Sequence, residues 1–255
     1  MEIFTYPAIY DIAFQFRSAR ETVDFVEECV RMYTHISPHS VLDVACGTGH
    51  YTLEFARRGY RTRGLDIDGE TCQYVRQKAV DESLEVDILC ANMADFSLPQ
   101  PCELAVNFFD SLTYLTDRRQ VSMHLLAVAD ALVSGGLYIL EIGVIDDFEN
   151  HNNEEIWTEH RRGCAVTATY LRDGAIDPGR GTFIEHCAFR ATCCEHHSFV
   201  VLKQPKLALY LYEFTDLVGN VGCFTPLVYF DDFASDAFLP EGAAPWRVIA
   251  VLQKN

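Results

Sequence analysis

The chain has 255 residues, 49% of them apolar and 22% charged, so it is long enough and apolar enough to form one large domain with a buried core. Its formal net charge of −17 argues against a nucleic acid substrate, because phosphate binding depends on clusters of Lys and Arg and none is present. No apolar run approaches the roughly 18 residues that span a bilayer, and the chain start has no basic region followed by an apolar core. We therefore expect a cytoplasmic protein that binds neither nucleic acid nor a membrane.

The first predicted element is helical and runs from residue 7 to about residue 37, because apolar residues recur there at helical spacing. We interpret this segment as a lid placed ahead of the first strand. Tyr6 and Tyr10 are four residues apart and so share a helix face, from which both rings could reach a ligand. The alternative role for these rings is simple packing.

Strands and helices then alternate regularly along the chain. Strands are expected at residues 41–45, 61–66, 86–90, 103–108 and 137–143, and helices at about 49–58, 69–82 and 117–133. The pair Gly135-Gly136 is expected to end the last of these helices. Such alternation predicts a parallel sheet covered by helices on both faces.

The pattern changes to a period of two between residues 146 and 204, with apolar alternation at 164–171, 182–192 and 195–203 and a turn at Asp177-Pro178-Gly179. We interpret residues 146–204 as a small antiparallel sheet inserted after the fifth strand. A helix at about 207–221 and strands at 224–230 and 246–252 would complete a seven-stranded sheet. Residues 1–145 and 205–255 would thus form the core domain, with the insertion on its substrate side.

A glycine turn follows the first predicted strand and contains Gly47 and Gly49, and Asp66 ends the second strand 17 residues after Gly49. A buried strand that runs into a glycine turn opening a helix, with an acid at the end of the next strand, is how proteins hold an adenosine-bearing ligand. Dinucleotide-binding domains require a third glycine three residues further on, where this chain has Thr52. The pattern therefore indicates a nucleoside ligand but disfavours a dinucleotide.

The spacing Asp-x-x-x-Gly-x-Gly, at Asp43, Gly47 and Gly49, resembles the nucleotide loop of the class I methyltransferases that use S-adenosylmethionine. The resemblance implies a Rossmann-like α/β fold, S-adenosylmethionine as methyl donor, and Asp66 as the acceptor of hydrogen bonds from both ribose hydroxyls. One departure is Ala45, where many members of that family carry glycine. The cofactor-binding residues implied in this part of the chain are Asp43, Ala45, Cys46, Gly47, Gly49, Asp66 and Ile67.

Two further stretches match the same family. Asn92, Met93 and Ala94 follow the third strand, where a short stretch lines the adenine in that family; Asn92 replaces a common acid, but its amide oxygen can still accept from the adenine amino group. Asp95 is a weaker candidate there, with a capped turn as the alternative. The fourth strand ends in Asn107, Phe108, Phe109 and Asp110, and the Asp-Ser-Leu-x-Tyr-Leu run from Asp110 resembles a subgroup that modifies small molecules.

Open parallel sheets bind ligands beyond the carboxyl ends of their strands, so residues 107–110 should face the sulfonium and the acceptor. One of the two phenylalanines is expected to line an apolar wall, and the other to pack in the core. Residues that match the substrate side of related enzymes only loosely are Trp157, Arg161, Glu185, His197, Tyr210, Glu213 and Phe214.

The run Cys193-Cys194-Glu195-His196-His197 suggests a metal site, but neighbouring residues on a strand point to opposite faces and no C-x-x-C pair is present. We therefore predict no metal. The chain has ten cysteines, and several lie inside predicted strands and helices, where a reduced cysteine packs as a small hydrophobe. Most of them are expected to be free thiols.

The sequence thus predicts a methyltransferase that acts on a small molecule, on nitrogen rather than oxygen, by in-line displacement from S-adenosylmethionine with S-adenosylhomocysteine as product. The candidates for removing a proton from the acceptor are Glu141, His160, Glu185 and His186. Two alternatives stay open: a binding subunit without turnover, and an NAD-dependent oxidoreductase. The acceptor itself is not identified, and the sequence leaves a homodimer open.

Overall fold

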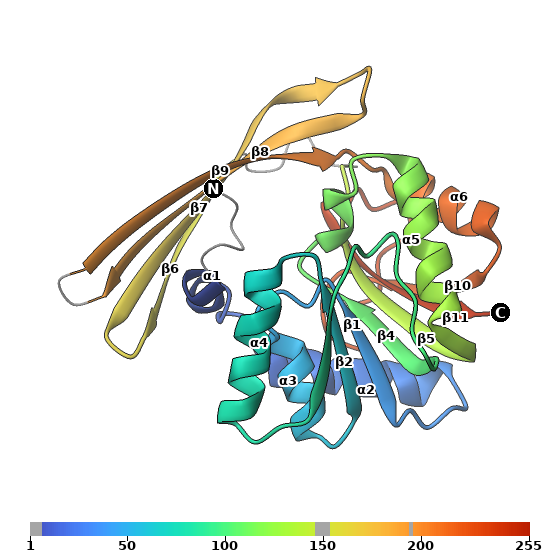
Figure 1. Cartoon of the computed structure of the whole chain (residues 1–255). Coiled ribbons are helices and arrows are strands. Elements are labelled where there is room, and N and C mark those ends of the chain that lie inside the picture. Colours follow the sequence, from blue (N-terminus) through green and yellow to red (C-terminus); the bar gives the residue numbers. More distant parts are fainter. Residues whose placement is uncertain (1–6, 146–153, 194–195) are drawn as a thin grey trace.

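The computed structural model describes residues 7–145, 154–193 and 196–255 (Figure 1). Seven strands form one sheet in the order β10-β11-β5-β4-β1-β2-β3, and four form a second sheet in the order β6-β7-β8-β9. β11 is antiparallel to both of its neighbours, and β1 to β5 are parallel to one another. The predicted seven-stranded, mostly parallel Rossmann-like sheet with an added antiparallel sheet is confirmed.

The first sheet is built from β1 (Ser40–Val44), β2 (Arg61–Asp66), β3 (Val86–Cys90), β4 (Cys102–Asn107), β5 (Leu132–Gly143), β10 (Phe224–Phe230) and β11 (Arg247–Lys254). The helices are α1 (Pro7–Ala13), α2 (Ala19–Tyr33), α3 (His50–Arg57), α4 (Gly69–Asp81), α5 (Arg118–Asp130) and α6 (Leu211–Val221), with the 3-10 helix η2 (Ser111–Tyr114). The second sheet is built from β6 (Glu154–Arg161), β7 (Cys164–Asp177), β8 (Thr182–Cys193) and β9 (His196–Leu207).

Alternation along the central strands divides the core between the two faces of the large sheet. On β5, Leu137 and Ile139 pack with α2 and α3, whereas Tyr138 and Leu140 pack with α5 and α6. Side chains of a strand point alternately to opposite faces, so a strand that is apolar at every position must be covered on both. The predicted coverage by helices on both faces is thus confirmed.

The predicted N-terminal helix is two helices, α1 and α2, with residues 14–18 between them. Ser18 ends this connection, because its hydroxyl accepts from the backbone N–H of Glu21 and so caps α2. α1 lies between α4 and the second sheet, where it packs against β6 and β7 (Figure 1). It therefore covers the carboxyl end of the large sheet from the side of the insertion.

The prediction that Gly135-Gly136 ends a helix is wrong. α5 ends at Asp130 and β5 begins at Leu132, so both glycines lie inside β5, where the pairing with β4 shifts register between Cys102 and Leu104. A Cβ on Gly136 would come within 2.9 Å of the carbonyl oxygen of Glu103. The pair thus permits a bulge and a close approach of two strands, which glycine also signals.

The antiparallel sheet has one strand more than the three predicted, since β6 pairs with β7 along its whole length. The predicted turn at residues 177–179 is confirmed: the side chain of Asp177 accepts from the backbone N–H of Gly179 at 2.8 Å between β7 and β8. At the other end of that hairpin, Cys164 and Cys193 form a disulfide. Seven cysteines of the described chain are free thiols, as expected for most of the ten, and Cys194 lies outside the described residues.

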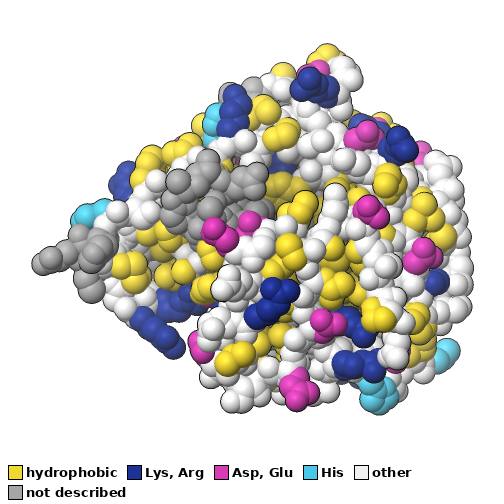
Figure 2. All heavy atoms as spheres, viewed as in Figure 1, with side chains coloured by type: hydrophobic (Ala, Val, Ile, Leu, Met, Phe, Trp, Pro, Cys, Tyr) yellow, Lys and Arg dark blue, Asp and Glu magenta, His cyan; other side chains and the backbone are white. Residues whose placement is uncertain are grey.

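Among the described residues, none of the helices combines the length and the apolar character that a bilayer span requires. On the face shown in Figure 2, the Lys and Arg side chains are scattered over several elements rather than gathered into one patch.

Candidate active site

The loop between β1 and α3 turns back on itself through three residues with positive φ: Ala45 at 54°, Gly47 at 51° and Gly49 at 75°. The backbone N–H of Gly47 donates to Oδ2 of Asp66 at 2.9 Å, which ties the loop to the end of β2. Glycine is preferred at Ala45 in the resembled family because this left-handed conformation suits a residue without Cβ. The departure seen in the sequence therefore falls on a strained backbone position.

The two glycines of the loop have different roles. A Cβ on Gly49 would lie 2.6 Å from a methyl group of Val75, so this position allows α3 to pack against α4. A Cβ on Gly47 would meet only the ring of Tyr10, at 3.8 Å. Gly47 therefore presents its open side toward α1.

Thr52 stands where a dinucleotide-binding domain would have glycine, and its hydroxyl donates to Asp43 Oδ2 at 2.6 Å. Asp43 is buried in β1, and burial raises the pKa of its carboxyl to about 7. The pair joins the first turn of α3 to β1. Thr52 thus has a structural role that no glycine could fill.

The predicted adenosine side lies along the ends of β2 and β3. Asp66 is buried, Ile67 beside it is 64% exposed, and Met93 is buried. The side chain of Asn92 accepts from the backbone N–H of Ala94 at 2.9 Å and so shapes the turn after β3. The structure brings these residues to one edge, because the backbone N–H of Ala91 donates to the carbonyl of Asp66.

The end of β4 is the most constrained part of the site. Phe109 and Asp110 both have positive φ, at 55° and 53°. The Phe109 N–H donates to Glu141 at 2.7 Å, and the Gly143 N–H donates to Asp110 at 2.7 Å. Both carboxylates thus hold this turn in place, and Gly143 must lack a Cβ, which would lie 2.8 Å from the Asp110 carboxylate.

Asn107 and the two phenylalanines divide the roles expected of this stretch. Asn107 donates to the carbonyl of Val44 at 2.7 Å, but its side-chain oxygen is buried and accepts no hydrogen bond from any described residue. Phe108 is 3% exposed and packs edge-on against Tyr51 and Phe233, whereas Phe109 lines the large cavity beyond the strand ends.

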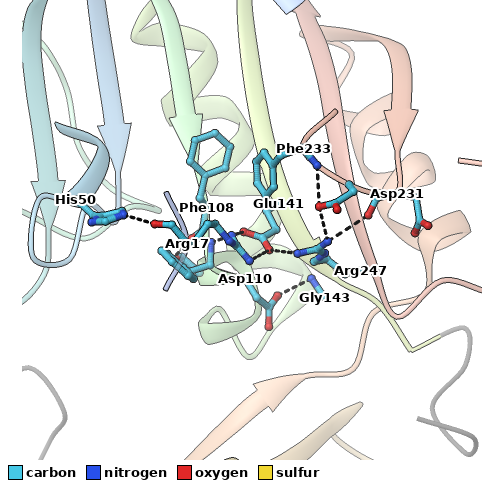
Figure 3. Close-up of polar contacts among 12 residues, drawn as sticks. Arg17, His50, Phe108, Asp110, Glu141, Gly143, Asp231, Phe233 and Arg247 are labelled. Carbon is cyan, nitrogen blue, oxygen red and sulfur yellow. Dashed lines mark hydrogen bonds and ion pairs between the residues drawn. The ribbon is translucent and has the colours of Figure 1, made fainter. Parts of the chain in front are cut away.

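Glu141 is held by two arginines rather than open to an acceptor (Figure 3). Arg17 donates to both of its oxygens, at 2.5 and 2.9 Å, and Arg247 lies 3.4 Å away. The Arg17 guanidinium also lies 4.3 Å from the ring centroid of Phe109. With the Phe109 N–H added, this carboxylate is surrounded by donors, so the geometry favours a role in positioning the turn over a role as proton acceptor.

A cavity of ≈ 590 Å³ lies between the turn after β4, α1 and the inner face of the second sheet. Its wall is aromatic and charged. The aromatic residues are Tyr10, Phe14, Phe16, Phe109, Tyr114, Trp157, Tyr170, Phe183 and Trp246, and the charged ones are Arg17, Asp110, Glu141, Glu155, Glu159, Arg172, Glu185, Lys206 and Arg247. Its size is within the usual range for small-molecule sites.

The predicted substrate-side residues separate according to the face of the strand they occupy. Glu185 and Trp157 line the cavity, whereas His160, His186 and His197 are absent from its lining. Apart from Ile156, the lining residues of β6 and β8 are the odd-numbered ones, so His160 and His186 fall on the opposite face. The structure therefore does not bring these two candidates for proton removal to the cavity.

The remaining substrate-side candidates also lie elsewhere. Arg161 pairs with Asp11 of α1 at 2.7 Å, and Glu213 pairs with Arg118. Phe214 lies on α6 and is buried in the core. Tyr210 caps the start of α6 and is 37% exposed. Tyr6 lies outside the described residues, while Tyr10 lines the cavity.

The sequence did not single out Arg17, Arg172 or Lys206, although each lines the cavity. For Lys206 the sequence held no clear signal, because residues 199–202 are all apolar. Only the burial of Val200 and Leu202 in the structure shows that every second residue, including 206, faces inward. For Arg17 there was no signal, because it lies in a connection whose position only the tertiary structure fixes.

Comparison with known proteins shows what the chain is similar to. Residues 41–136 match the family model described as a methyltransferase domain. The structure of an S-adenosylmethionine-dependent methyltransferase from Clostridium acetobutylicum superimposes with a TM-score of 0.80 over 98% of both chains, at 17% identity. That of Streptomyces venezuelae DesVI does so with a TM-score of 0.79 over 100% of this chain and 99% of the other, at 18% identity.

A relative in sequence is the dTDP-3-amino-3,4,6-trideoxy-alpha-D-glucopyranose N,N-dimethyltransferase of Streptomyces venezuelae, 29% identical over 136 residues, which are 52% of this chain and 55% of the relative. The chain spans about half the length, or less, of the relatives that it matches in sequence. Residues 41–136 thus match a methyltransferase domain, and the whole chain has the fold of the S-adenosylmethionine-dependent methyltransferases it superimposes on.

Proposed function

We propose that this protein transfers a methyl group from S-adenosylmethionine to an amine nitrogen of a small-molecule acceptor. The observation that carries the proposal is the position of the large cavity. It meets the constrained turn at Phe109 and Asp110, next to the glycine loop, and its far wall is the second sheet with the carboxylate of Glu185.

The residues around the loop fit S-adenosylmethionine. Asp66 is a buried acceptor for ribose hydroxyls, and Gly47 presents an open side. No described residue donates to the buried side-chain oxygen of Asn107, so an amino group of the cofactor could supply the missing hydrogen bond. When bound, S-adenosylmethionine supplies a methyl group on a positively charged sulfur. We assign to the adenosine side Ile67, Asn92, Met93 and Ala94. We assign to the loop that holds the cofactor Asp43, Ala45, Cys46 and Gly49.

The acceptor amine must be neutral to attack, because a protonated nitrogen has no free electron pair. Glu185 lines the cavity, and burial raises the pKa of its carboxyl, which brings it closer to that of an amine. We propose that Glu185 accepts the proton: an N–H bond breaks, an O–H bond forms, and the neutral nitrogen takes the methyl group while the sulfur keeps the electron pair of the broken bond. Enclosure by the aromatic rings would hold the reactants in line, a contribution of about 7–11 kcal/mol in favourable cases.

The sequence relative named above acts on an amino sugar, by its name, which supports nitrogen over oxygen as the acceptor atom. An NAD-dependent oxidoreductase is disfavoured because Thr52 fills the position of the third glycine and is bonded to Asp43. A subunit without turnover would bind S-adenosylhomocysteine but release no product, so turnover separates it from the proposal.

The test has two parts. Radiolabelled S-adenosylmethionine is incubated with a panel of small primary and secondary amines and with their alcohol analogues, and transfer is counted. We expect transfer to amines and not to alcohols, and a Glu185→Gln variant that folds but loses at least tenfold in kcat/KM. Transfer to alcohols alone, or to neither class, would contradict the proposal.

In the second part, S-adenosylhomocysteine binding is measured by calorimetry. Asp66→Ala is expected to weaken it by about 1.5–3 kcal/mol, the scale of hydrogen bonds to a charged group. Asp81→Ala, at the end of α4 and away from the loop, is the matched control and should bind as the unaltered protein does.

A further inference from the structure

Lys206 is a buried lysine at the wall of the cavity. It is 3% exposed and lies at the end of β9, on the inner face of the second sheet. A charged side chain is almost never fully buried unless it is paired. The contacts of its ammonium group therefore indicate its role in the site.

The ammonium of Lys206 lies between the two parts of the site. It donates to the hydroxyl of Thr113 at 3.0 Å, and it lies 3.5 Å from the ring centroid of Tyr114. Oδ2 of Asp110 is 3.6 Å away and Oε2 of Glu185 is 4.0 Å away. One carboxylate belongs to the turn after β4 and the other to β8, so Lys206 is a cation placed between the core and the insertion at the proposed reaction site.

The hydroxyl of Thr113 extends this arrangement toward the turn. It donates to the carboxylate of Asp110 at 2.7 Å while it accepts from Lys206, and Asp110 in turn accepts from the Gly143 N–H. The ammonium thus supports one side of the constrained turn, and Glu141 supports the other. A substitution of Lys206 would therefore change the surroundings of two carboxylates, those of Asp110 and Glu185.

Resting on the proposed function, we propose that Lys206 is a positioning residue that holds Asp110 and Glu185 on either side of its ammonium and keeps Glu185 as a carboxylate facing the acceptor. Without it, two part-buried carboxylates on one wall would repel each other. That repulsion favours protonation of Glu185, which could then not receive the proton of the amine.

Several groups face Glu185 besides Lys206. They are Arg172 of β7, Asp110, Cys187 of the same strand, and the phenols of Tyr114 and Tyr170. Burial raises the pKa of Glu185, and Lys206 is the strongest influence in the opposite direction. Removing the ammonium is therefore expected to raise that pKa further, because the weaker influences of the Cys187 hydrogen bond and Arg172 would then oppose burial and Asp110.

The test compares Lys206→Met, Lys206→Gln and Lys206→Arg with Lys203→Met, whose side chain is exposed on the same strand. The pKa of Glu185 is followed by carbon-13 NMR of carboxyl-labelled glutamate, with its signal assigned by Glu185→Gln. Met and Gln should raise that pKa by about one unit, on the scale of a lost ion pair. Arg and the Lys203 control should leave it within a few tenths. The Gln variant still donates to Thr113, so it serves if the Met variant does not fold.

A second readout is the acid limb of the plot of kcat/KM against pH. Its apparent pKa should rise by the same amount in Lys206→Met and should equal that of the unaltered protein in Lys206→Arg. An unchanged pKa of Glu185 in a folded variant overturns the proposal. A large rise in KM with an unmoved acid limb also overturns it, since Lys206 would then bind the acceptor. If the unaltered protein methylates no amine, the proposed function fails, and the NMR titration still decides the role of Lys206.

Discussion

His124 shows how one buried side chain links the cofactor edge to the core. Its Nδ1 lies 2.9 Å from the carbonyl of Met93, and its Nε2 lies 2.7 Å from the hydroxyl of Tyr138. A carbonyl can only accept, so Nδ1 carries the hydrogen and Nε2 accepts from the tyrosine. Protonation of Nε2 would turn this acceptor into a donor inside a dry core.

Burial lowers the pKa of His124 to about 4, whereas an unfolded histidine titrates near about 6.5. Between those values the unfolded state binds more protons, so stability is lost as the pH falls from about 6.5 to about 4, by about 3 kcal/mol in total. His124→Gln can make both hydrogen bonds without titrating. The free energy of unfolding is measured by urea titration at several pH values. Its decrease between about pH 6.5 and pH 4 should be smaller by this amount in His124→Gln but unchanged in His35→Gln, whose side chain is exposed.

Ala45 occupies a left-handed position at a φ of 54°. Glycine would relieve about 1–2 kcal/mol of strain there and would cost about 0.4–1 kcal/mol through the more flexible unfolded chain. We therefore expect Ala45→Gly to raise the free energy of unfolding by about 0.5–1 kcal/mol. Ala127→Gly, inside α5, is the control and should lower it by about 1 kcal/mol. A loss of stability in Ala45→Gly would show that the strain argument is wrong.

At the scale of elements, α1 is fixed to two other elements by a single carboxylate. Asp11 is 4% exposed and accepts from Lys78 of α4 at 2.8 Å, from Tyr74 of α4 at 3.0 Å and from Arg161 of β6 at 2.7 Å. The recess under α1, beside the glycine loop, measures only ≈ 30 Å³. A ligand the size of S-adenosylmethionine that occupied this recess would require α1 to shift outward, which supports the interpretation of α1 as a lid.

We expect Asp11→Asn to loosen this lid. S-adenosylhomocysteine should associate several times faster, because less of the network must break before α1 moves, and stability should fall by about 1–2 kcal/mol since both cations are part-exposed. Trp157 donates to the carbonyl of Ala13 at the end of α1, so its fluorescence in stopped-flow reports the movement. Asp24→Asn on α2, an exposed ion pair, is the control and should leave the association rate unchanged.

The same network depends on pH in a defined direction. Burial by itself would raise the pKa of Asp11, but Lys78 and Arg161 outweigh it and lower that pKa below its ordinary value. The stabilisation is therefore present above the unfolded pKa and is lost as the pH falls through the folded one. At neutral pH the lid network is intact.

At the scale of the whole molecule, the net charge of −17 affects the binding of a charged acceptor. A negative field attracts cations, and salt screens it over about 10 Å at 0.1 M. We expect the KM of a cationic amine acceptor to rise severalfold between 50 mM and 500 mM salt on this account, and the KM of a neutral amine to stay constant. Equal salt dependence for both would show that the field has no part in binding.

The sequence by itself determined the order of the elements, the Rossmann-like sheet and the glycine loop, because these depend on local periodicity and on glycines within one turn of the chain. It missed β6 and misread Gly135-Gly136, where the pairing of distant strands outweighs the local pattern.

Only the tertiary structure decided the composition of the cavity. Glu141 could look like a base in the sequence, yet Arg17 and Arg247 surround it from segments more than 100 residues away. His160 and His186 fell on the outer face because strand register sets which residues face inward, and a shift of one residue exchanges the two faces. Lys206, Asp110 and Glu185 meet for the same reason: the insertion folds back over the end of β4, and no local pattern records that contact.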